Sequence, residues 1–176
     1  MRHGLMTLVA LSLATTGLAQ DREGHEKNEA GEGAAAAQGL APALKGVKVS
    51  LASGLHAAEK EGRPISGKFE LEEGKLQLSV YTIKDGKFSE VIVDHQTGKV
   101  AKSEPITGGE DLAAAQKQAD AMAKTKHTLR DAIALAEKAN PGYHAVSVVP
   151  EIEDGKPRAD LTLLKGSSSK SVDEPL

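Results

Sequence analysis

The chain has 176 residues, a formal net charge of −3, and neither cysteine nor tryptophan. Without cysteine it has no thiol nucleophile, no thiolate metal ligand and no disulfide. Aromatic residues make up only 2% of the sequence and the charge is mildly negative, so we expect no nucleic-acid partner. With 39% hydrophobic residues, the chain is long enough for one ordinary domain or two small ones.

Residues 1–19 have the pattern of a secretory signal peptide. Arg2 gives a basic start, Leu5–Leu13 is an apolar run, and small residues lead to a predicted cleavage site after Ala19. A membrane anchor is the alternative, but Gly17 and the threonines before it interrupt the run short of the roughly 20 apolar residues that a span needs. We therefore predict a periplasmic or secreted protein with no stable membrane insertion once the leader is removed.

Residues 20–46 follow as a predicted linker. The stretch to about Gly33 is rich in Glu and Gly and has no apolar periodicity, which is typical of disorder. The Ala-rich part that follows carries Gly39 and Pro42, so we expect any helix there to be weak or broken.

The rest of the chain shows an internal repeat. Ser50-Leu51 matches Thr128-Leu129, Ala58-Glu59-Lys60 matches Ala136-Glu137-Lys138, and Gly74-Lys75 matches Gly155-Lys156 after one small insertion. Matches that keep their order in this way indicate a duplication. We predict one unit at 47–104, a helical linker at 105–126 and a second unit at 127–176.

Each unit opens with an amphipathic helix whose ends are readable. Ser50 is the candidate N-cap of the first helix, and Gly62 followed by Pro64 ends it. Thr128 with Asp131 three residues later resembles a capping box for the second. The apolar stripes at helical spacing are Leu51, Leu55 and Ala58 in the first helix, and Leu129, Ile133 and Ala136 in the second.

After the first helix the apolar period changes to two, which is typical of strands. The turns Glu73-Gly74 and Asp85-Gly86 separate three strands, of which the third runs over Phe88–Val93. Asp94 is placed to accept backbone N–H bonds in the next turn, and Val100 follows on a short last strand.

The second unit departs from this pattern after its strands at Ala145–Ile152 and Arg158–Leu164. The stretch Gly166–Lys170 replaces the start of a third strand, and the sequence ends at Leu176 where a fourth should follow. An incomplete sheet exposes an edge, which proteins usually cover or blunt. Either Pro175 and the charged tail do so, or the two units pack as one pseudo-symmetric body, which we favour.

The connection Gly109–Lys124 is rich in Ala and Gln, with Leu112, Ala115, Ala119 and Met122 at helical spacing. A helix here could order the two units against each other, or it could be a solvated spacer. The predicted fold class is therefore α+β, with two tandem copies of a helix packed on a small antiparallel sheet and the second copy truncated.

One family shares these features. A capped helix ending in Ala58-Glu59-Lys60, a hairpin, and then Val91-Ile-Val-Asp94-x-x-Thr97-Gly98-Lys99-Val100 resembles the PepSY domain of peptidase propeptides. The helix Thr128–Gly142 resembles the same family's helix and its exit. The resemblance implies association with, and sometimes restraint of, secreted peptidases.

The sequence carries no catalytic constellation. It has no Gly-x-Ser-x-Gly elbow, no His-Glu-x-x-His and no Gly-x-Gly-x-x-Gly after a strand. We therefore expect no enzyme, no cofactor and no catalytic residues. Acidic clusters at the equivalent hairpin tips, Glu70–Glu73 and Glu151–Asp154, could attract Ca²⁺ or a basic partner, but solvated turns explain them more simply, and we predict no metal site.

Two hypotheses of function remain. The first is an exported regulatory protein that binds a secreted peptidase or other envelope protein, whose extended segment adds to an open sheet edge. The contacts would then lie along Phe88–Val93 or on the open edge of the second unit, and the predicted partner-binding residues are Phe88, Glu90, Ile92 and Val172. The second is a ligand or metal-ion sensor of the cell envelope that uses the acidic tips or a cavity between the copies.

Overall fold

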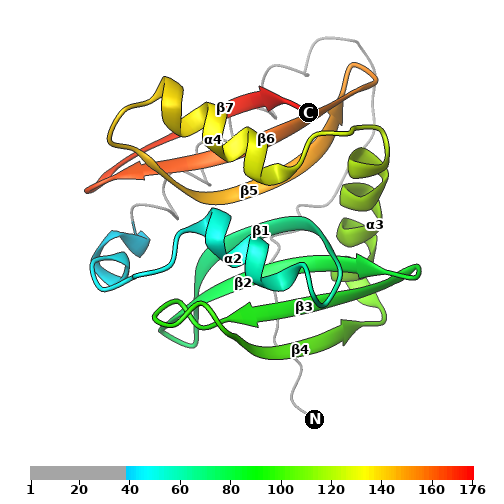
Figure 1. Ribbon diagram of the computed structural model, residues 1–176, viewed down its shortest axis with the longest axis horizontal. Helices are drawn as coiled ribbons and strands as arrows, with labels where there is room; N and C mark the ends of the chain where they lie inside the picture. The colour runs from blue at the N-terminus through cyan, green and yellow to red at the C-terminus, as the bar shows by residue number, and fades with distance from the viewer. Residues whose placement is uncertain (1–38) are drawn as a thin grey trace, which may run out of the picture.

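A computed structural model describes residues 39–176 and shows an α+β fold with a seven-stranded antiparallel open sheet (Figure 1). The predicted signal peptide and residues 20–38 of the predicted linker lie outside the described residues. The elements are α2 (Leu51–Ala58), β1 (Arg63–Glu72), β2 (Lys75–Lys84), β3 (Lys87–Val93), β4 (Val100–Ile106), α3 (Gly109–Ala123), α4 (Leu129–Ala139), β5 (His144–Glu153), β6 (Lys156–Lys165) and β7 (Ser168–Pro175).

One sheet contains the strands of both predicted units. Its strand order is β4-β3-β2-β1-β5-β6-β7, so the two ranges meet at the antiparallel pair β1 and β5. There Gly67 lies opposite Val148, and Lys68 lies opposite Ser147. The units 47–104 and 127–176 therefore share a sheet, and β4 and β7 are its two edges.

The hairpins follow from their turn residues. Glu73 and Gly74 have φ of 50° and 77°, and Asp154 and Gly155 have φ of 48° and 77°. Two consecutive residues with positive φ make the tight turn whose twist matches that of the flanking strands, and Gly, Asp and Asn supply it at least cost. The turn after β3 is built as predicted, because one Asp94 oxygen accepts from the backbone N–H groups of the residues two and three positions on.

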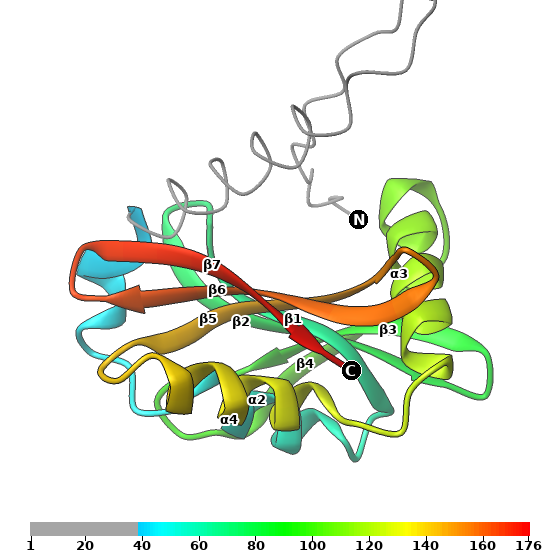
Figure 2. The ribbon, with the colours of Figure 1, turned by 90° about the horizontal axis from the view of Figure 1, so that it is seen from above.

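The two predicted amphipathic helices lie next to each other on one face of the sheet (Figure 2). Ser50 Oγ accepts a hydrogen bond from Ser53 N at 3.1 Å and caps α2. Thr128 and Asp131 form a reciprocal capping box at the start of α4. Both predicted caps are confirmed, and the apolar stripes of both helices are buried.

The helix α3 packs on the opposite face of the sheet. A side chain at Gly67 would point toward Leu55 of α2, so its neighbour Ser66 points to the other side. Ser66 Oγ donates to Gln118 Oε1 of α3 at 2.8 Å, and Arg63 Nη2 donates to the Met122 carbonyl at 2.5 Å. The connection is therefore a packed helix that ties the two halves together, which decides between the two alternatives above.

A single hydrophobic core lies between the sheet and the helices α2 and α4. It joins side chains of the first half with side chains of the second, and its members with the least exposure include Leu51, Leu55, Leu78, Val80, Val91, Val148, Leu161 and Leu163. Most of its members are aliphatic, in keeping with the low aromatic content.

Three sequence predictions need correction. The last strand of the first half is not short, because β4 runs over Val100–Ile106 and pairs along β3. The third strand of the second half is present from Ser168, so Gly166–Lys170 does not replace its start. Finally, residues 39–44 are helical and Leu40 is buried, so this end of 20–46 is not an unstructured linker.

Among residues 39–176, no helix is long and apolar enough to cross a membrane.

The close approach of α2 to the sheet depends on Gly54. A Cβ placed there would lie 2.5 Å from Leu78 Cδ2 in the core. We predict that Gly54→Val lowers the free energy of unfolding by about 1–3 kcal/mol, as overpacked cores do. Urea unfolding followed by circular dichroism measures this. The matched control is Gly46→Val, where no heavy atom lies within 4 Å, and an equal loss in both variants would contradict the packing explanation.

Candidate functional site

The strand β3 is an interior strand, which corrects the prediction that Phe88–Val93 forms an open edge. It pairs with β2 on one side and with β4 on the other, so its main-chain groups are engaged on both sides. Phe88, Glu90 and Ile92 alternate with the buried Val91 and Val93 and lie on the face opposite α2. A partner cannot add a strand at β3, and these three residues can offer only their side chains.

The fourth predicted contact residue, Val172, lies on the edge strand β7. Its side chain packs partly buried against the core, far along the sheet from β3, so the structure does not bring Val172 together with the other three. In an antiparallel pair of strands, every second residue directs its main-chain N–H and C=O groups toward the partner strand. Leu176 N donates to the Pro157 carbonyl at 3.2 Å, and this bond shows which residues of β7 do so; we call this alternation the phase of the strand. In that phase Val172 directs its main chain inward, toward Leu161.

The residues on either side of Val172 have the opposite orientation. Because the main-chain groups of successive strand residues point to alternate sides, Ser171 and Asp173 direct theirs away from the β6 main chain. The Asp173 carbonyl accepts from Arg158 Nη2 at 3.5 Å, so a further strand would meet the two main-chain groups of Ser171 and the N–H of Asp173. Pro175 also directs its main chain away from β6, so its lack of an N–H group removes no hydrogen bond between β6 and β7. The outward face of β7 is therefore a template for a further strand, centred on Ser171 and Asp173.

The two edges of the sheet differ in regularity. The register of β4 shifts next to Val93, its side chains are almost all exposed, and it carries Pro105 and the ion pair between Lys102 and Glu104 at 2.7 Å. Irregularity, proline and charge are the usual means by which proteins blunt an edge. The strand β7 also carries charged residues and Pro175, but it differs from β4 in register, because it pairs with β6 from Ser168 to Pro175 without a shift.

Contacts from α4 hold β7 in place. Lys170 Nζ donates to Asn140 Oδ1 at the end of α4 and lies 5.2 Å from the centre of the Tyr143 ring. Lys165 Nζ lies 5.7 Å from the same ring. The edge strand is thus anchored on its helix side while its outward main chain faces away from the fold.

The face opposite α2 carries a polar network around the predicted residue Glu90. Ser79 Oγ donates to Glu70 Oε1 at 2.7 Å, and Lys68 Nζ lies 2.8 Å from Glu70 Oε2. Burial raises the pKa of Glu90, the neighbouring Ser79 hydroxyl lowers it, and the charge of Glu70 raises it again. Burial, together with these two carboxylates, also raises the pKa of Tyr81.

The pKa shift of Glu90 predicts a pH dependence of stability. Because its pKa is higher in the folded than in the unfolded state, the folded chain holds the proton more tightly, and the free energy of unfolding falls as pH rises through the interval between the two values. We expect Glu90→Gln to raise the melting temperature at pH 7 and to change it little at pH 3. The control is Glu72→Gln at an exposed hairpin tip, and a Glu90→Gln variant less stable than the native chain at pH 7 would contradict the account.

One carboxylate at each acidic hairpin tip is paired with a basic side chain. Glu70 is paired with Lys68, and Glu153 Oε2 lies 2.8 Å from Arg158 Nε. Within residues 39–176, no three His, Asp or Glu side chains lie close enough together to hold a metal ion. The tips therefore give the metal-ion hypothesis no geometric support.

A cleft of about 610 Å³ opens between the two halves, where the end of α2 faces the loop from α3 to α4. Leu55, Met122 and Leu129 form a buried apolar floor. The other lining residues are Glu59, Gly62, Arg63, Pro64, Thr125, Lys126, His127, Thr128 and Arg130. This volume is in the range of about 300–1,000 Å³ that is usual for small-molecule sites.

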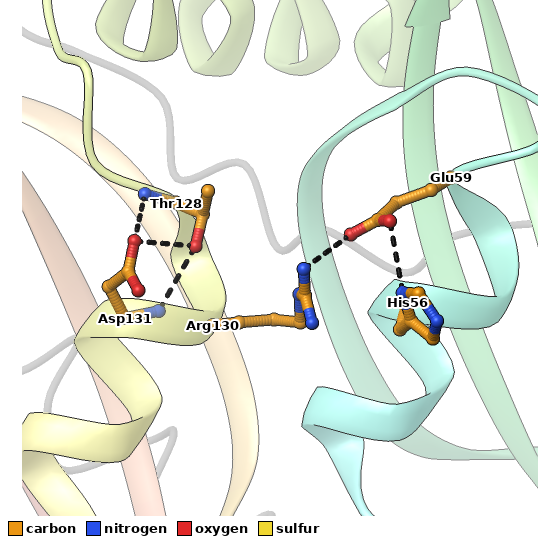
Figure 3. Close-up of polar contacts among 5 residues, drawn as sticks. All are labelled: His56, Glu59, Thr128, Arg130 and Asp131. Carbon is orange, nitrogen blue, oxygen red and sulfur yellow. Dashed lines mark hydrogen bonds and ion pairs between the residues drawn. The ribbon is translucent and has the colours of Figure 1, made fainter.

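A chain of polar contacts crosses the cleft from one helix to the other (Figure 3). Arg130 Nη2 lies 3.0 Å from Glu59 Oε1, and His56 Nδ1 lies 3.0 Å from Glu59 Oε2. Asp131 turns to the other side and accepts from Thr128 N and Oγ1, both at 2.8 Å. Arg130 is therefore oriented by Glu59, while the first turn of α4 is satisfied by its own cap.

Sequence reasoning missed these residues because nothing local marks them. The cleft joins two distant stretches of the chain, residues 55–64 and 122–130, and its arginines stand in no recognisable motif. The internal repeat gave a partial signal. Its alignment includes Glu59 and the start of the second helix, and in the structure Glu59 contacts Arg130 at that helix start.

Comparisons of the chain with family models, with curated proteins and with solved structures found no match.

Proposed function

We propose that the chain is an exported, non-enzymatic binding protein, periplasmic or secreted, that takes up an extended segment of a partner as an eighth strand beside β7. The observation that carries this proposal is the regular outward edge of β7, with Ser171 and Asp173 presenting main-chain groups away from β6. The partner class we propose is a secreted peptidase or another envelope protein, which the sequence resemblance to PepSY domains favours.

We also propose that the two halves are tandem copies of one PepSY-like unit. The order of helix and antiparallel strands occurs twice along the chain, with a side-chain cap on each helix and the same turn after each first strand. The repeat alignment that matches Gly74 with Gly155 also matches Gly67 with Val148, and these two residues lie opposite each other in the central strand pair. A pseudo-twofold axis at that pair accounts for the strand order.

Strand addition suits a protein without a catalytic constellation. Main-chain hydrogen bonds supply affinity with little dependence on sequence, and alternate side chains of the added strand supply specificity. The added strand would place its side chains alternately on the α4 side, beside Val172, and on the opposite side.

The proposal is tested by capture followed by an activity assay. The chain from Gln20 to Leu176 is immobilised and exposed to native envelope and extracellular extract, and bound proteins are identified. We expect a peptidase whose activity falls when the free chain is added. Capture of the same proteins by a heat-unfolded chain, or a retained peptidase whose activity does not change, would contradict the regulatory role.

A ligand sensor of the cell envelope is the second candidate function, and the cleft between α2 and α4 favours it. Its volume and apolar floor suit a small molecule. Calorimetric titration of the chain with small ligands separates this candidate from the first, because no residue of β7 lines the cleft.

A further inference from the structure

We propose that the cleft between the two halves binds an apolar chain that ends in a carboxylate. This inference rests on the second candidate function, ligand binding in the cleft, and does not depend on strand addition at β7. It is carried by the apolar floor, by the charges around it, and by the way in which two arginines are positioned.

The floor of the cleft provides the apolar half of the site. Leu55 and Leu129 come from α2 and α4, and Met122 comes from the end of α3; all three are at most 2% exposed. Pro64 adds a further apolar surface at the side. Burying an aliphatic chain against these side chains removes apolar area from water, which favours binding.

The rim of the cleft is positively charged, although the whole chain is negative. Arg63, Lys126 and Arg130 line it together with one carboxylate, that of Glu59. His127 lies beside them, and the nearby Asp131 does not line the cleft because it caps α4 (Figure 3). Three fixed positive charges against one negative charge favour an anion over a cation or a neutral molecule.

Both arginines are held in place by groups that leave part of each guanidinium unused. Arg63 is tied to the Met122 carbonyl and Arg130 to Glu59, each through one nitrogen in the contacts seen among the described residues. A guanidinium carries five N–H donors in a fixed fork, and a carboxylate accepts two of them in parallel. Two oriented forks above an apolar floor match a single carboxylate on an apolar body.

Other anion classes fit less well. The residues that line the cleft include no Phe, Tyr or Trp, which are the large rings on which nucleobases usually stack. The backbone N–H groups of the first turn of α4 are partly satisfied by the capping box, so the helix start does not offer a phosphate site. The carboxylate could belong to the C-terminus of an apolar peptide or to a fatty acid, which share this chemistry.

The test is calorimetric titration of the whole chain with three probes: N-acetyl-Leu-Leu-Leu with a free carboxylate, the same peptide as its amide, and decanoate. We expect the peptide acid or decanoate to bind, which identifies the source, and the amide to bind about tenfold more weakly or not at all, since it lacks the charge that the arginines pair with. Absence of binding by both acids, or equal binding of acid and amide, would overturn the proposal.

Variants separate recognition from structural damage. Arg130→Gln should weaken acid binding about tenfold. Glu59→Gln should strengthen it severalfold, because the amide oxygen can still accept from Arg130 and orient it while the competing negative charge is removed. A gain of affinity cannot result from misfolding. The control is Lys156→Gln at an exposed hairpin position outside the cleft, which should leave affinity unchanged. Weaker binding in Glu59→Gln, or an equal loss in Lys156→Gln and Arg130→Gln, would contradict this site.

Discussion

Replacing Leu161 with alanine lowers the free energy of unfolding by about 2–5 kcal/mol and destabilises both halves of the sheet together. Leu161 lies on β6, is fully buried, and stands between Val148 on β5 and Val172 on β7. A buried leucine cut back to alanine loses its transfer free energy and leaves a cavity. Because one core joins the two halves, the loss is shared by the whole fold.

The chain offers built-in reporters for this experiment. It contains two tyrosines, Tyr81 in the first half and Tyr143 in the second, and no tryptophan. Variants Tyr143→Phe and Tyr81→Phe each leave one fluorescent reporter, and we expect both to show the same urea midpoint, lowered equally by Leu161→Ala. The control Leu135→Ala, at an exposed site on α4, should change stability by less than about 0.5 kcal/mol. If Leu161→Ala lowered the urea midpoint reported by Tyr143 but not the one reported by Tyr81, the two halves would unfold as independent units.

Replacing Ser171 with proline weakens partner binding at least about tenfold while the chain stays folded. Ser171 directs its N–H away from β6, so proline removes a donor that the fold does not use, and its ring blocks an approaching strand. A lost hydrogen bond is worth about 0.5–1.5 kcal/mol and the blocked neighbouring bonds add to it, so a factor of ten is a lower bound. Pro175 already occupies the same phase of the strand.

The matched control for Ser171→Pro is Ser171→Ala. It removes the hydroxyl but keeps the backbone N–H, so affinity for the captured partner should stay within about twofold of the native chain. Surface plasmon resonance on both variants, with circular dichroism as the check on folding, measures the difference. Equal loss in the two variants would assign the contact to the side chain, and no loss in Ser171→Pro would remove β7 as the site.

The local features of the fold were predictable from the sequence, and the length of the edge strand β4 was not. Caps and turns are decided within a few residues, as at Ser50 and Thr128, so a short pattern is enough. The length of β4 could not be predicted, because its Lys, Ser, Glu and Pro side chains are exposed and show no apolar alternation. Edge strands of this kind form through main-chain pairing, which leaves little trace in the side-chain pattern.

The candidate site was predictable only in part for the same reason. The sequence pointed to an open edge in the second unit and to Val172, and that residue lies on the edge strand β7. The sequence could not show which residues of β7 direct their main-chain groups outward, and the structure identifies Ser171 and Asp173. The pairing of β3 with β4 and the cleft at Arg63 and Arg130 depend on contacts between distant segments, so no local pattern carried them.

Amide hydrogen exchange, measured residue by residue by NMR, tests strand addition most directly. In the free chain we expect the amides of Ser171 and Asp173 to exchange faster than that of Val172, which points inward. Adding the captured partner should slow Ser171 and Asp173 and leave Lys102 and Glu104 on the opposite edge unchanged. If the partner binds at saturation and the exchange at Ser171 and Asp173 stays fast, β7 does not accept a strand and the proposed mode of binding is wrong.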